Sequence, residues 1–328
     1  MTIVIDSHIP YLRGVLEPYA QVVYLDPEAI TAQAVREADA LIIRTRTKCN
    51  EALLKDSKVQ FIATATIGFD HIDAAYCASH GITWTSCPGC NAQAVCDYVE
   101  EAILTLSTFH LPLSTFHLPL STTPTLGVIG VGHVGSLVQQ MALRHGWKVL
   151  LNDPPKDLVD GSVETLAKHC DILTFHTPLT MDGNDSTYHM VSEVLLRLCK
   201  PGLTIINAAR GGIIDEAAAL RVLAEGKDLH FVVDCWESEP NINKAFLSHP
   251  AVRLASYHIA GYSVQGKRNA SQMCLDALCR HFGLPALSIL PDDGLRGDNS
   301  SGWLSRITQA LKQSPDSFES LRHSYPLR

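Results

Sequence analysis

The stretch Thr125-Leu-Gly-Val-Ile-Gly-Val-Gly-His-Val-Gly135 decides the fold of this chain. A short apolar run ends at Ile129, glycines follow, and an amphipathic segment begins at Ser136. The pattern predicts a strand, a tight turn and a helix, with glycines that let the backbone approach a pyrophosphate group closely. The helix N-terminus adds amide donors and the positive end of the helix dipole. We therefore expect a dinucleotide site formed by Gly130, Gly132, His133, Val134 and Gly135.

A carboxylate stands at the distance from these glycines that such a site requires. Gly146 can end the helix, an apolar run follows at 148–151, and Asp153 comes just after it. An acidic residue about 20 positions beyond the glycines binds the ribose 2′-hydroxyl of NAD and repels the 2′-phosphate of NADP. The glycine motif alone is a weak signal, but with this spacing it predicts NAD as the cofactor. Lys156 lies nearby and leaves some use of NADP open.

Length and composition place the chain among soluble globular proteins. Its 328 residues correspond to about two domains, and 46% apolar with 18% charged residues is an ordinary globular balance. A formal net charge of -8 argues against a nucleic-acid binder or a protein of anionic membrane surfaces. The charge-free stretch 102–143 is broken by prolines, glycines and histidines, so it lacks the roughly 20 consecutive apolar residues of a membrane span.

Apolar runs alternate with helical segments along most of the chain, which predicts an α/β fold. We expect two Rossmann-like doubly wound parallel-sheet domains, with the active site in the cleft between them. The expected strands lie at 3–6, 40–43, 61–64 and 82–84, and then at 125–129, 148–151, 172–175, 204–207, 231–234 and 252–254. The main helices are expected at 91–107, 136–145 and 264–282, with a short one near 304–311.

The expected domains are a discontinuous substrate-binding domain, residues 1–106 and 283–328, and an NAD-binding domain, residues 107–282. A heptapeptide at 107–113, Ser-Thr-Phe-His-Leu-Pro-Leu, is repeated at 114–120. Each copy carries a proline that resists helix continuation, so we interpret the repeat as an interdomain connection. Whether it is a lengthened loop without a role or a hinge for domain closure stays open.

Ten cysteines are scattered singly, which indicates a reducing compartment and a cytoplasmic protein. Cys87 and Cys90 have the spacing of a redox pair, an interpretation that we disfavour because they lie just before an expected helix. No compact Cys/His set and no His-Glu-x-x-His motif occurs, so we expect no metal site.

Three side chains with complementary chemistry follow three neighbouring expected strands of the second domain. Arg210 comes after 204–207, Glu239 after 231–234 and His258 after 252–254. Ligands of open α/β sheets bind at the carboxyl ends of the strands. A guanidinium there suits a carboxylate or carbonyl, and a histidine oriented by a carboxylate can take the proton of an alcohol. Together with a dinucleotide site, the three predict a dehydrogenase in which His258 is the base and Glu239 orients it.

Several motifs resemble the D-isomer-specific 2-hydroxyacid dehydrogenase family. The more discriminating ones are Thr64-Ala-Thr-Ile-Gly-Phe-Asp-His-Ile-Asp73 and His258-Ile-Ala-Gly-Tyr-Ser-Val-Gln-Gly-Lys267. Pro88-Gly-Cys-Asn91 and Phe175-His-Thr-Pro178 also match, and the resemblance covers about residues 1–283. It implies NAD-dependent oxidation of a phosphorylated 2-hydroxy acid by a homodimer, although the tail after residue 282 is shorter than the family's usual dimerisation region.

The resemblance also assigns residues. It implies that Arg210, Glu239 and His258 are catalytic and that Asp153, Thr177, Asp234 and Gly261 contact NAD. It implies substrate contacts for Thr45, Thr66 and Tyr262. The cluster of Arg44, Arg46 and Lys48 in an acidic chain is a plausible counter-charge for a phosphate, or else an ordinary solvated cluster.

Two other functions stay open on the sequence alone. The substrate could be another small or phosphorylated 2-hydroxy acid, such as 3-phosphoglycerate, because the three catalytic residues do not separate these substrates. The chain could also be an NAD-responsive regulatory protein, although no added interaction segment beyond the short tail supports this.

Overall fold

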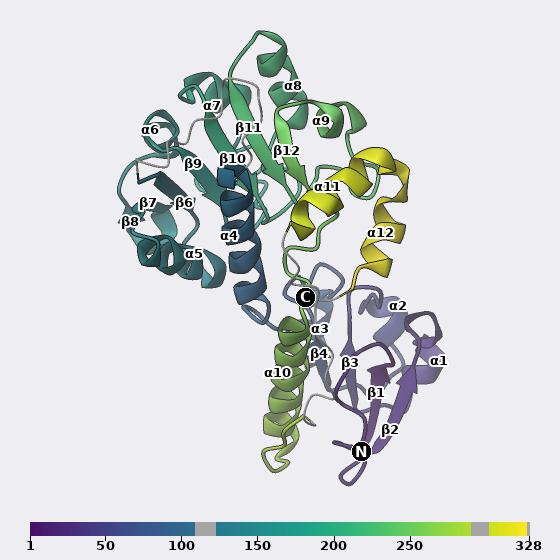
Figure 1. Cartoon of the computed structure of the whole chain (residues 1–328). Coiled ribbons are helices and arrows are strands. Elements are labelled where there is room, and N and C mark those ends of the chain that lie inside the picture. Colours follow the sequence, from purple (N-terminus) through teal and green to yellow (C-terminus); the bar gives the residue numbers. More distant parts are fainter. Residues whose placement is uncertain (109–122, 290–301, 327–328) are drawn as a thin grey trace. The chain divides into compact units, whose positions relative to one another are not determined.

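The computed structural model describes residues 1–108, 123–289 and 302–326, which form two compact units (Figure 1). The first unit contains the described residues of Met1–Asn91 and Tyr262–Gly297, and the second those of Ala92–Gly261 and Asp298–Arg328. Each unit is built on a mainly parallel sheet with helices on its faces. The predicted α/β class and the two doubly wound sheets are therefore confirmed.

The first unit has a five-stranded, wholly parallel sheet of order β2-β1-β3-β4-β5. Its strands are β1 (Thr2–Asp6), β2 (Gln21–Leu25), β3 (Ala40–Ile43), β4 (Phe61–Thr64) and β5 (Thr83–Thr85). Its helices are α1 (Ala32–Val35), α2 (Glu51–Leu54), α3 (Ala74–Ser79), α10 (Val264–Phe282) and the 3-10 turn η1 (Pro27–Ala29). The strand order is one of the two common doubly wound orders, so ligands are expected at the carboxyl edge of the sheet.

Alternating side chains of these strands enter two separate cores, because successive side chains of a strand point to opposite faces. Ile3, Ile5, Ile42 and Phe61 share one core with buried side chains of α10, and Figure 1 shows that helix beside the first sheet. The intervening residues, such as Val4, enter the other core together with side chains of α1, α2 and α3. Both faces of the sheet are covered, which explains its near-continuous apolar strands.

The second unit has a seven-stranded sheet of order β12-β11-β10-β9-β6-β7-β8, parallel except for the pair β7 and β8. Its strands are β6 (Thr125–Ile129), β7 (Lys148–Asp153), β8 (Leu158–Val159), β9 (Ile172–Phe175), β10 (Leu203–Asn207), β11 (Leu229–Val233) and β12 (Val252–Ala255). The chain passes from β6 to β7 on one side and then to β9 on the other. The strand order therefore reverses between β6 and β9, where doubly wound folds bind dinucleotides.

Helices cover both faces of this second sheet. Figure 1 shows α4 (Ala92–Thr108) and α5 (His133–Arg144) on one side, with α6 (Val163–His169), α7 (Glu193–Leu198) and α8 (Glu216–Ala224) on the other. The unit also contains α9 (Lys244–Ser248), α11 (Trp303–Gln313), α12 (Phe318–Ser324) and the 3-10 turns η2 (Pro154–Lys156) and η3 (Pro315–Ser317).

Helix α11 covers the edge strand of the second sheet. Thr308 Oγ1 accepts a hydrogen bond from Ala255 N and also contacts the Ala255 carbonyl, at 2.9 and 3.1 Å. Lys312 Nζ donates to the Val252 carbonyl at 2.6 Å. These bonds give partners to backbone groups of β12 that a sheet edge would otherwise expose.

The unit boundaries differ from the predicted domain boundaries 106/107 and 282/283. Helix α10 belongs to the first unit because Ala270, Cys274 and Leu278 are buried in that unit's core. Helix α4 belongs to the second unit, where Tyr98 bonds Ser256, and so does α11. Residues 109–120 of the repeated heptapeptide lie outside the described residues, so both interpretations of the repeat stay open. Across the described helices, none combines the length and apolar character needed to cross a membrane.

Candidate active site

The glycine turn after β6 has the geometry that the sequence predicts. Gly130 has a φ of 83°, and a side chain there would lie 2.8 Å from Thr177, which follows β9. A side chain on Gly135 would lie 2.0 Å from the Gly130 carbonyl oxygen, so only glycine lets helix α5 pack this closely. Gly132, by contrast, faces open space. Gly130 thus permits the turn, Gly135 permits the close helix contact, and Gly132 leaves room for a ligand.

Unsatisfied polar groups at this turn fit a dinucleotide. Helix α5 begins after Gly132 with no side-chain cap, which leaves its first amide donors for an anion. The hydroxyl oxygen of Thr177 is buried and has no hydrogen-bond partner within the described residues. Both groups lie where β6 and β9 end, at the reversal of strand order. The residues present therefore fit the pyrophosphate end of NAD.

Asp153 ends β7 and is turned towards the glycine loop. Its Oδ2 accepts a hydrogen bond from Val131 N at 2.7 Å, and Lys156 Nζ lies 3.9 Å away. Lys156 itself donates to the Val131 carbonyl at 2.7 Å. One carboxylate oxygen thus fixes the loop, while the other makes no hydrogen bond to the described residues, and the contact of Asp153 with a ribose hydroxyl stays a prediction.

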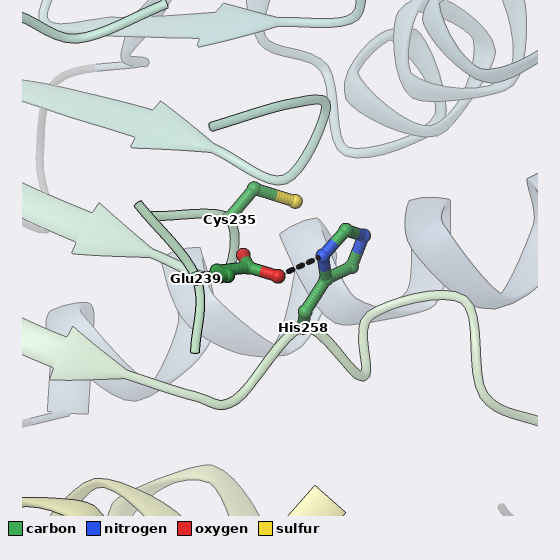
Figure 2. Close-up of side chains that lie close together, drawn as sticks. All are labelled: Cys235, Glu239 and His258. Atoms are coloured by element: carbon green, nitrogen blue, oxygen red, sulfur yellow. Dashed lines mark hydrogen bonds and ion pairs between the residues drawn. The ribbon is translucent and has the colours of Figure 1, made fainter. Parts of the chain in front are cut away.

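Glu239 and His258 are brought together as predicted, 19 positions apart in sequence. His258 Nδ1 lies 2.8 Å from Glu239 Oε2, and Figure 2 shows this bond. An ionised carboxylate only accepts, so Nδ1 donates its proton and the lone pair of the neutral ring lies on Nε2. The second carboxylate oxygen accepts from Trp236 N at 2.9 Å, which fixes the orientation of Glu239.

The surroundings of His258 set its proton affinity. Burial lowers the pKa of this imidazole, but Cys235 and the Glu239 carboxylate outweigh burial, and the pKa lies well above its usual value. Burial raises the pKa of the Cys235 thiol to about 11, so this thiol is neutral near pH 7. The Glu239 carboxylate is therefore the charge that stabilises protonated His258 under those conditions.

Asp234 holds the loop that carries His258. Its carboxylate is buried and accepts hydrogen bonds from Ser256 Oγ, Ile259 N and Ala260 N, at 2.7 to 3.0 Å. Its backbone carbonyl accepts from His258 N at 2.9 Å. These bonds stabilise the left-handed conformation of His258, with a φ of 58°, which costs a non-glycine residue about 1–2 kcal/mol. Asp234 thus has a structural function, and the implied contacts of Asp234 and Gly261 with NAD stay predictions.

Arg210 lies on the loop after β10, and this loop is locked to the neighbouring loop after β11. Asn207 Nδ2 donates to the carbonyls of Arg210 and Cys235, at 2.9 and 3.1 Å. A side chain on Gly211 would lie 1.9 Å from the Trp236 carbonyl oxygen, so the two backbones are in direct contact. Arg210 Nη1 donates to the Ala209 carbonyl at 2.8 Å. The guanidinium therefore keeps other donors for a ligand.

Sequence reasoning missed two residues of this site. Glu216, at the start of α8, is 3% exposed and accepts from Glu237 N at 2.8 Å, which holds the loop of Glu239. Burial raises the pKa of Glu216 to about 7, with further contributions from Glu237 and Glu239. Cys235 is the other missed residue, and its position two residues after the end of β11 was the available signal.

Arg44 lies at the carboxyl edge of the first sheet, together with Thr45 and Thr66, two of the residues for which the resemblance implies substrate contacts. Arg44 follows β3 and donates from Nε and Nη2 to the two oxygens of Asp6, at 2.9 and 3.1 Å. Asp6 ends β1 and is fully buried. Thr66 follows β4 and donates to the Gly68 carbonyl at 2.9 Å, whereas Thr45 is exposed. The parallel strands therefore place these side chains along one edge.

The basic cluster of the sequence divides in the structure. Arg46 lies 3.7 Å from Glu28 at an exposed position, whereas Arg44 is only 29% exposed. Burial and the charge of Arg44 lower the pKa of Lys267, which places a second cation near Arg44. Among the described residues, the side chain of Lys267 makes no hydrogen bond or ion pair, whereas its backbone N donates to the Ser263 carbonyl at 3.1 Å. Tyr262 stands half-buried just before α10, the helix that carries Lys267.

Comparison with known proteins identifies the family. Residues 114–260 match the family "D-isomer specific 2-hydroxyacid dehydrogenase, NAD binding domain". Over 345 aligned positions the chain is 41% identical to an erythronate-4-phosphate dehydrogenase of Bacteroides fragilis, with 100% of this chain and 97% of that protein covered. The chain belongs to the D-isomer-specific 2-hydroxyacid dehydrogenase family. An erythronate-4-phosphate dehydrogenase of Pseudomonas fluorescens is 39% identical, with 96% of this chain and 80% of that protein covered.

A solved structure of this family has the same fold as this chain. The NAD+-bound 3-phosphoglycerate dehydrogenase of Entamoeba histolytica superposes with a TM-score of 0.68 at 25% identity, covering 89% of this chain and 99% of that one. The predicted family, enzyme class and NAD cofactor are confirmed: this dehydrogenase is an NAD-dependent oxidoreductase. The individual site residues and the cleft between the domains stay predictions.

Proposed function

We propose that this dehydrogenase oxidises 4-phospho-D-erythronate to 2-oxo-3-hydroxy-4-phosphobutanoate with NAD, a step towards pyridoxal 5′-phosphate. The Glu239–His258 pair is the observation that carries the proposal, because it supplies a base beside the NAD-binding strands. The identity of 41% to an erythronate-4-phosphate dehydrogenase over the full chain supports this substrate. The structural likeness to a 3-phosphoglycerate dehydrogenase makes 3-phosphoglycerate the second candidate.

The chemistry follows from the hydrogen bonds of the site. His258 Nε2 takes the proton of the substrate 2-hydroxyl, and Glu239 stabilises the charge that the ring then carries. Arg210 binds the substrate carboxylate with its remaining donors and holds C2 in place. Asp234 and Glu216 fix the two loops, so that His258 and Glu239 do not move as the proton is transferred. NAD, held at the glycine turn after β6, would supply the acceptor for the hydride of C2.

The phosphate is assigned to the first unit. Arg44 is oriented by its paired bonds to Asp6, and Lys267 adds a second cation near it. We propose that both bind the phosphate, with Thr45, Thr66 and Tyr262 contacting the rest of the substrate. Arg46 remains a weaker candidate because its side chain is 50% exposed, whereas that of Arg44 is 29% exposed and is oriented by the buried Asp6.

The phosphate assignment is tested by the ratio of kcat/KM for 4-phospho-D-erythronate to that for D-erythronate. Arg44→Lys and Lys267→Met should lower this ratio by about tenfold or more each, the effect of losing a charge-assisted hydrogen bond of about 1.5–3 kcal/mol. The unphosphorylated substrate is the control for folding, because both rates fall together if the fold is damaged. A ratio that stays at the wild-type value in both variants would remove the assignment.

The substrate itself is tested by product formation with NAD and a 2-oxo acid that reoxidises NADH. Preferential turnover of 4-phospho-D-erythronate supports the proposal, and preferential turnover of 3-phosphoglycerate replaces it by the second candidate. No turnover with either would favour an NAD-responsive regulatory protein. We also propose a cytoplasmic location, since all ten cysteines are free thiols. A homodimer is proposed on the family resemblance alone, and sedimentation of the purified protein tests it.

A further inference from the structure

A cysteine stands beside the Glu239–His258 pair. Cys235 is the second residue after β11, and its side chain converges with those of Glu239 and His258 (Figure 2). One ligand atom from each of the three, namely the sulfur, a carboxylate oxygen and a ring nitrogen, lies within 4.8 Å of the other two. This is the one such group of three or more metal-binding side chains among the described residues.

We propose that Cys235, Glu239 and His258 form an inhibitory site for Zn2+. Sulfur, imidazole nitrogen and carboxylate oxygen are the three ligand types that Zn2+ takes in proteins, usually in tetrahedral geometry. Calcium and magnesium ions prefer oxygen ligands alone, so the sulfur selects against them. A site with three protein ligands also keeps one open position for water or substrate.

Access and distances suit a small cation. The side chains of His258 and Glu239 are 32% and 18% exposed, so the ion reaches them from solvent, while Cys235 lies beneath them with 2% exposure. Nδ1 and Oε2 are 2.8 Å apart, with a proton between them. An ion bonded to both at about 2.0–2.2 Å needs them slightly further apart, which a change of side-chain rotamer supplies.

Binding of the ion withdraws the base of the reaction. When the ring of His258 is neutral, which is the form that acts as the base, the thiol carries one proton, Nδ1 carries another, and Nε2 has the lone pair. When Zn2+ bonds the sulfur, Nδ1 and Glu239, the thiol proton passes to solvent and the ring proton ends on Nε2. One proton is released in total, and Nε2 can no longer accept the hydroxyl proton. The inhibition rests on the role proposed for His258, whereas the metal site itself does not.

The sequence predicts no metal site, and the positions of the three residues along the chain explain why no such site could be predicted. Glu239 lies in the loop after Cys235, but His258 comes 19 positions beyond Glu239. This spacing matches no compact ligand motif of the kind used for zinc. The parallel neighbours β11 and β12 bring the two loops together at their carboxyl ends.

Direct metal binding is tested first, with Co2+ as a spectroscopic probe for Zn2+ in the full chain. The wild-type protein should show a thiolate-to-cobalt charge-transfer band in the near ultraviolet, and Zn2+ should displace the band at one ion per chain. Cys235→Ala should lack the band. If Cys235→Ala does not fold, Cys235→Ser replaces it in the same test. Cys199→Ala is the control, because its buried thiol bonds only the Leu195 carbonyl, and it should keep the band. A band that persists without the Cys235 thiol, or none in the wild type, overturns the proposal.

Inhibition is tested second, as the ratio of turnover with and without zinc chloride within each variant. The zinc concentration for half-inhibition should rise by at least about tenfold in Cys235→Ala and stay unchanged in Cys199→Ala, since losing even a group that only orients a metal ligand costs about 10–100-fold in metal affinity. Equal inhibition of both variants overturns the inhibitory role. A cobalt band in a protein that turns over neither substrate keeps the metal site and refutes only the proposed function.

Discussion

Replacing Glu239 by glutamine should move the pH dependence of alcohol oxidation to lower pH. His258 must be unprotonated to act as the base, so kcat/KM rises with pH through the pKa of this imidazole. The Glu239 carboxylate, 2.8 Å away, stabilises the protonated ring and raises that pKa. Without this charge the ring loses its proton more readily, and the rising limb of the profile shifts downwards.

The size of the shift follows from the geometry. An opposite charge within hydrogen-bonding distance moves a pKa by about 1–3 units. Because the two side chains are 32% and 18% exposed, solvent screens part of this interaction, and we expect a downward shift smaller than that of a fully buried pair. The plateau should also fall, by about 10²–10⁴-fold, because a glutamine amide can donate to Nδ1 and leave the proton on Nε2.

The assay is initial-rate NADH formation across the pH range, with a chelator present to remove metal ions. Glu237→Gln is the matched control, because that carboxylate lies in the same loop but pairs with His189 Nε2 at 2.9 Å. Its rising limb should stay at the wild-type pH. A limb that does not move in Glu239→Gln, or that moves upwards, would refute the argument that this carboxylate sets the pKa of His258.

Three further predictions concern the NAD-binding unit. Gly135→Ala should lower stability by about 1–3 kcal/mol or prevent folding, because its Cβ would lie 2.0 Å from a backbone oxygen. Gly132→Ala faces open space, so thermal melting should change little while the Kd for NAD rises; equal melting temperatures for the two variants would contradict this. Asp153→Asn should lower the ratio of kcat/KM with NAD to kcat/KM with NADP by about tenfold or more. The reason is that it removes a repulsion of at least about 1.4 kcal/mol between the Asp153 carboxylate and the 2′-phosphate of NADP. An unchanged ratio would speak against a role of Asp153 in the choice of cofactor. Glu216 has a pKa raised to about 7, so its ionisation destabilises the fold as pH rises from about 4.5 to 7. Glu216→Gln keeps the acceptor oxygen and should therefore be more stable than wild type above that range, by about 3 kcal/mol, and similar below it; a pH-independent difference in melting temperature would contradict this.

The buried strands could be predicted from the sequence because burial on both faces makes them continuous apolar runs. The strands at 40–43, 61–64, 125–129 and 172–175 are found at the predicted positions. Strand β2 was missed because it is a sheet edge of mostly half-exposed residues, in which the apolar run is short. Helix α12 was also missed, because it has only seven residues and buries Phe318 alone, so no helical pattern of apolar residues is seen in the sequence.

The boundaries of the two units differ from the predicted domain boundaries for a different reason. Both α4 and α10 are long helices, and nothing in their sequence patterns indicates which of the two sheets each packs against. Tertiary packing decides the partner sheet of each helix. Helix α10 follows the second sheet in the chain but buries Cys274 and Leu278 in the first. No local pattern carries this information.

The pairing of Glu239 with His258 could be predicted because parallel strands bring their carboxyl ends to one edge, so residues after neighbouring strands meet. The same rule places Arg210, but it does not say that Asn207 and Gly211 lock its loop to the next one. Glu216 and Cys235 were missed since a buried carboxyl on a helix and a scattered cysteine have no spacing signature. Their roles appear only from the contacts with Glu237 and His258.

The most direct test of the central claim follows the hydride itself. 4-Phospho-D-erythronate labelled with deuterium at C2 is incubated with NAD, and the NADH formed is analysed by mass spectrometry. Hydride transfer predicts that the label appears in NADH, and that His258→Ala lowers the rate by about 10²–10⁴-fold. Unlabelled NADH, or a His258→Ala variant as fast as the wild type, would contradict oxidation at C2 with His258 as the base.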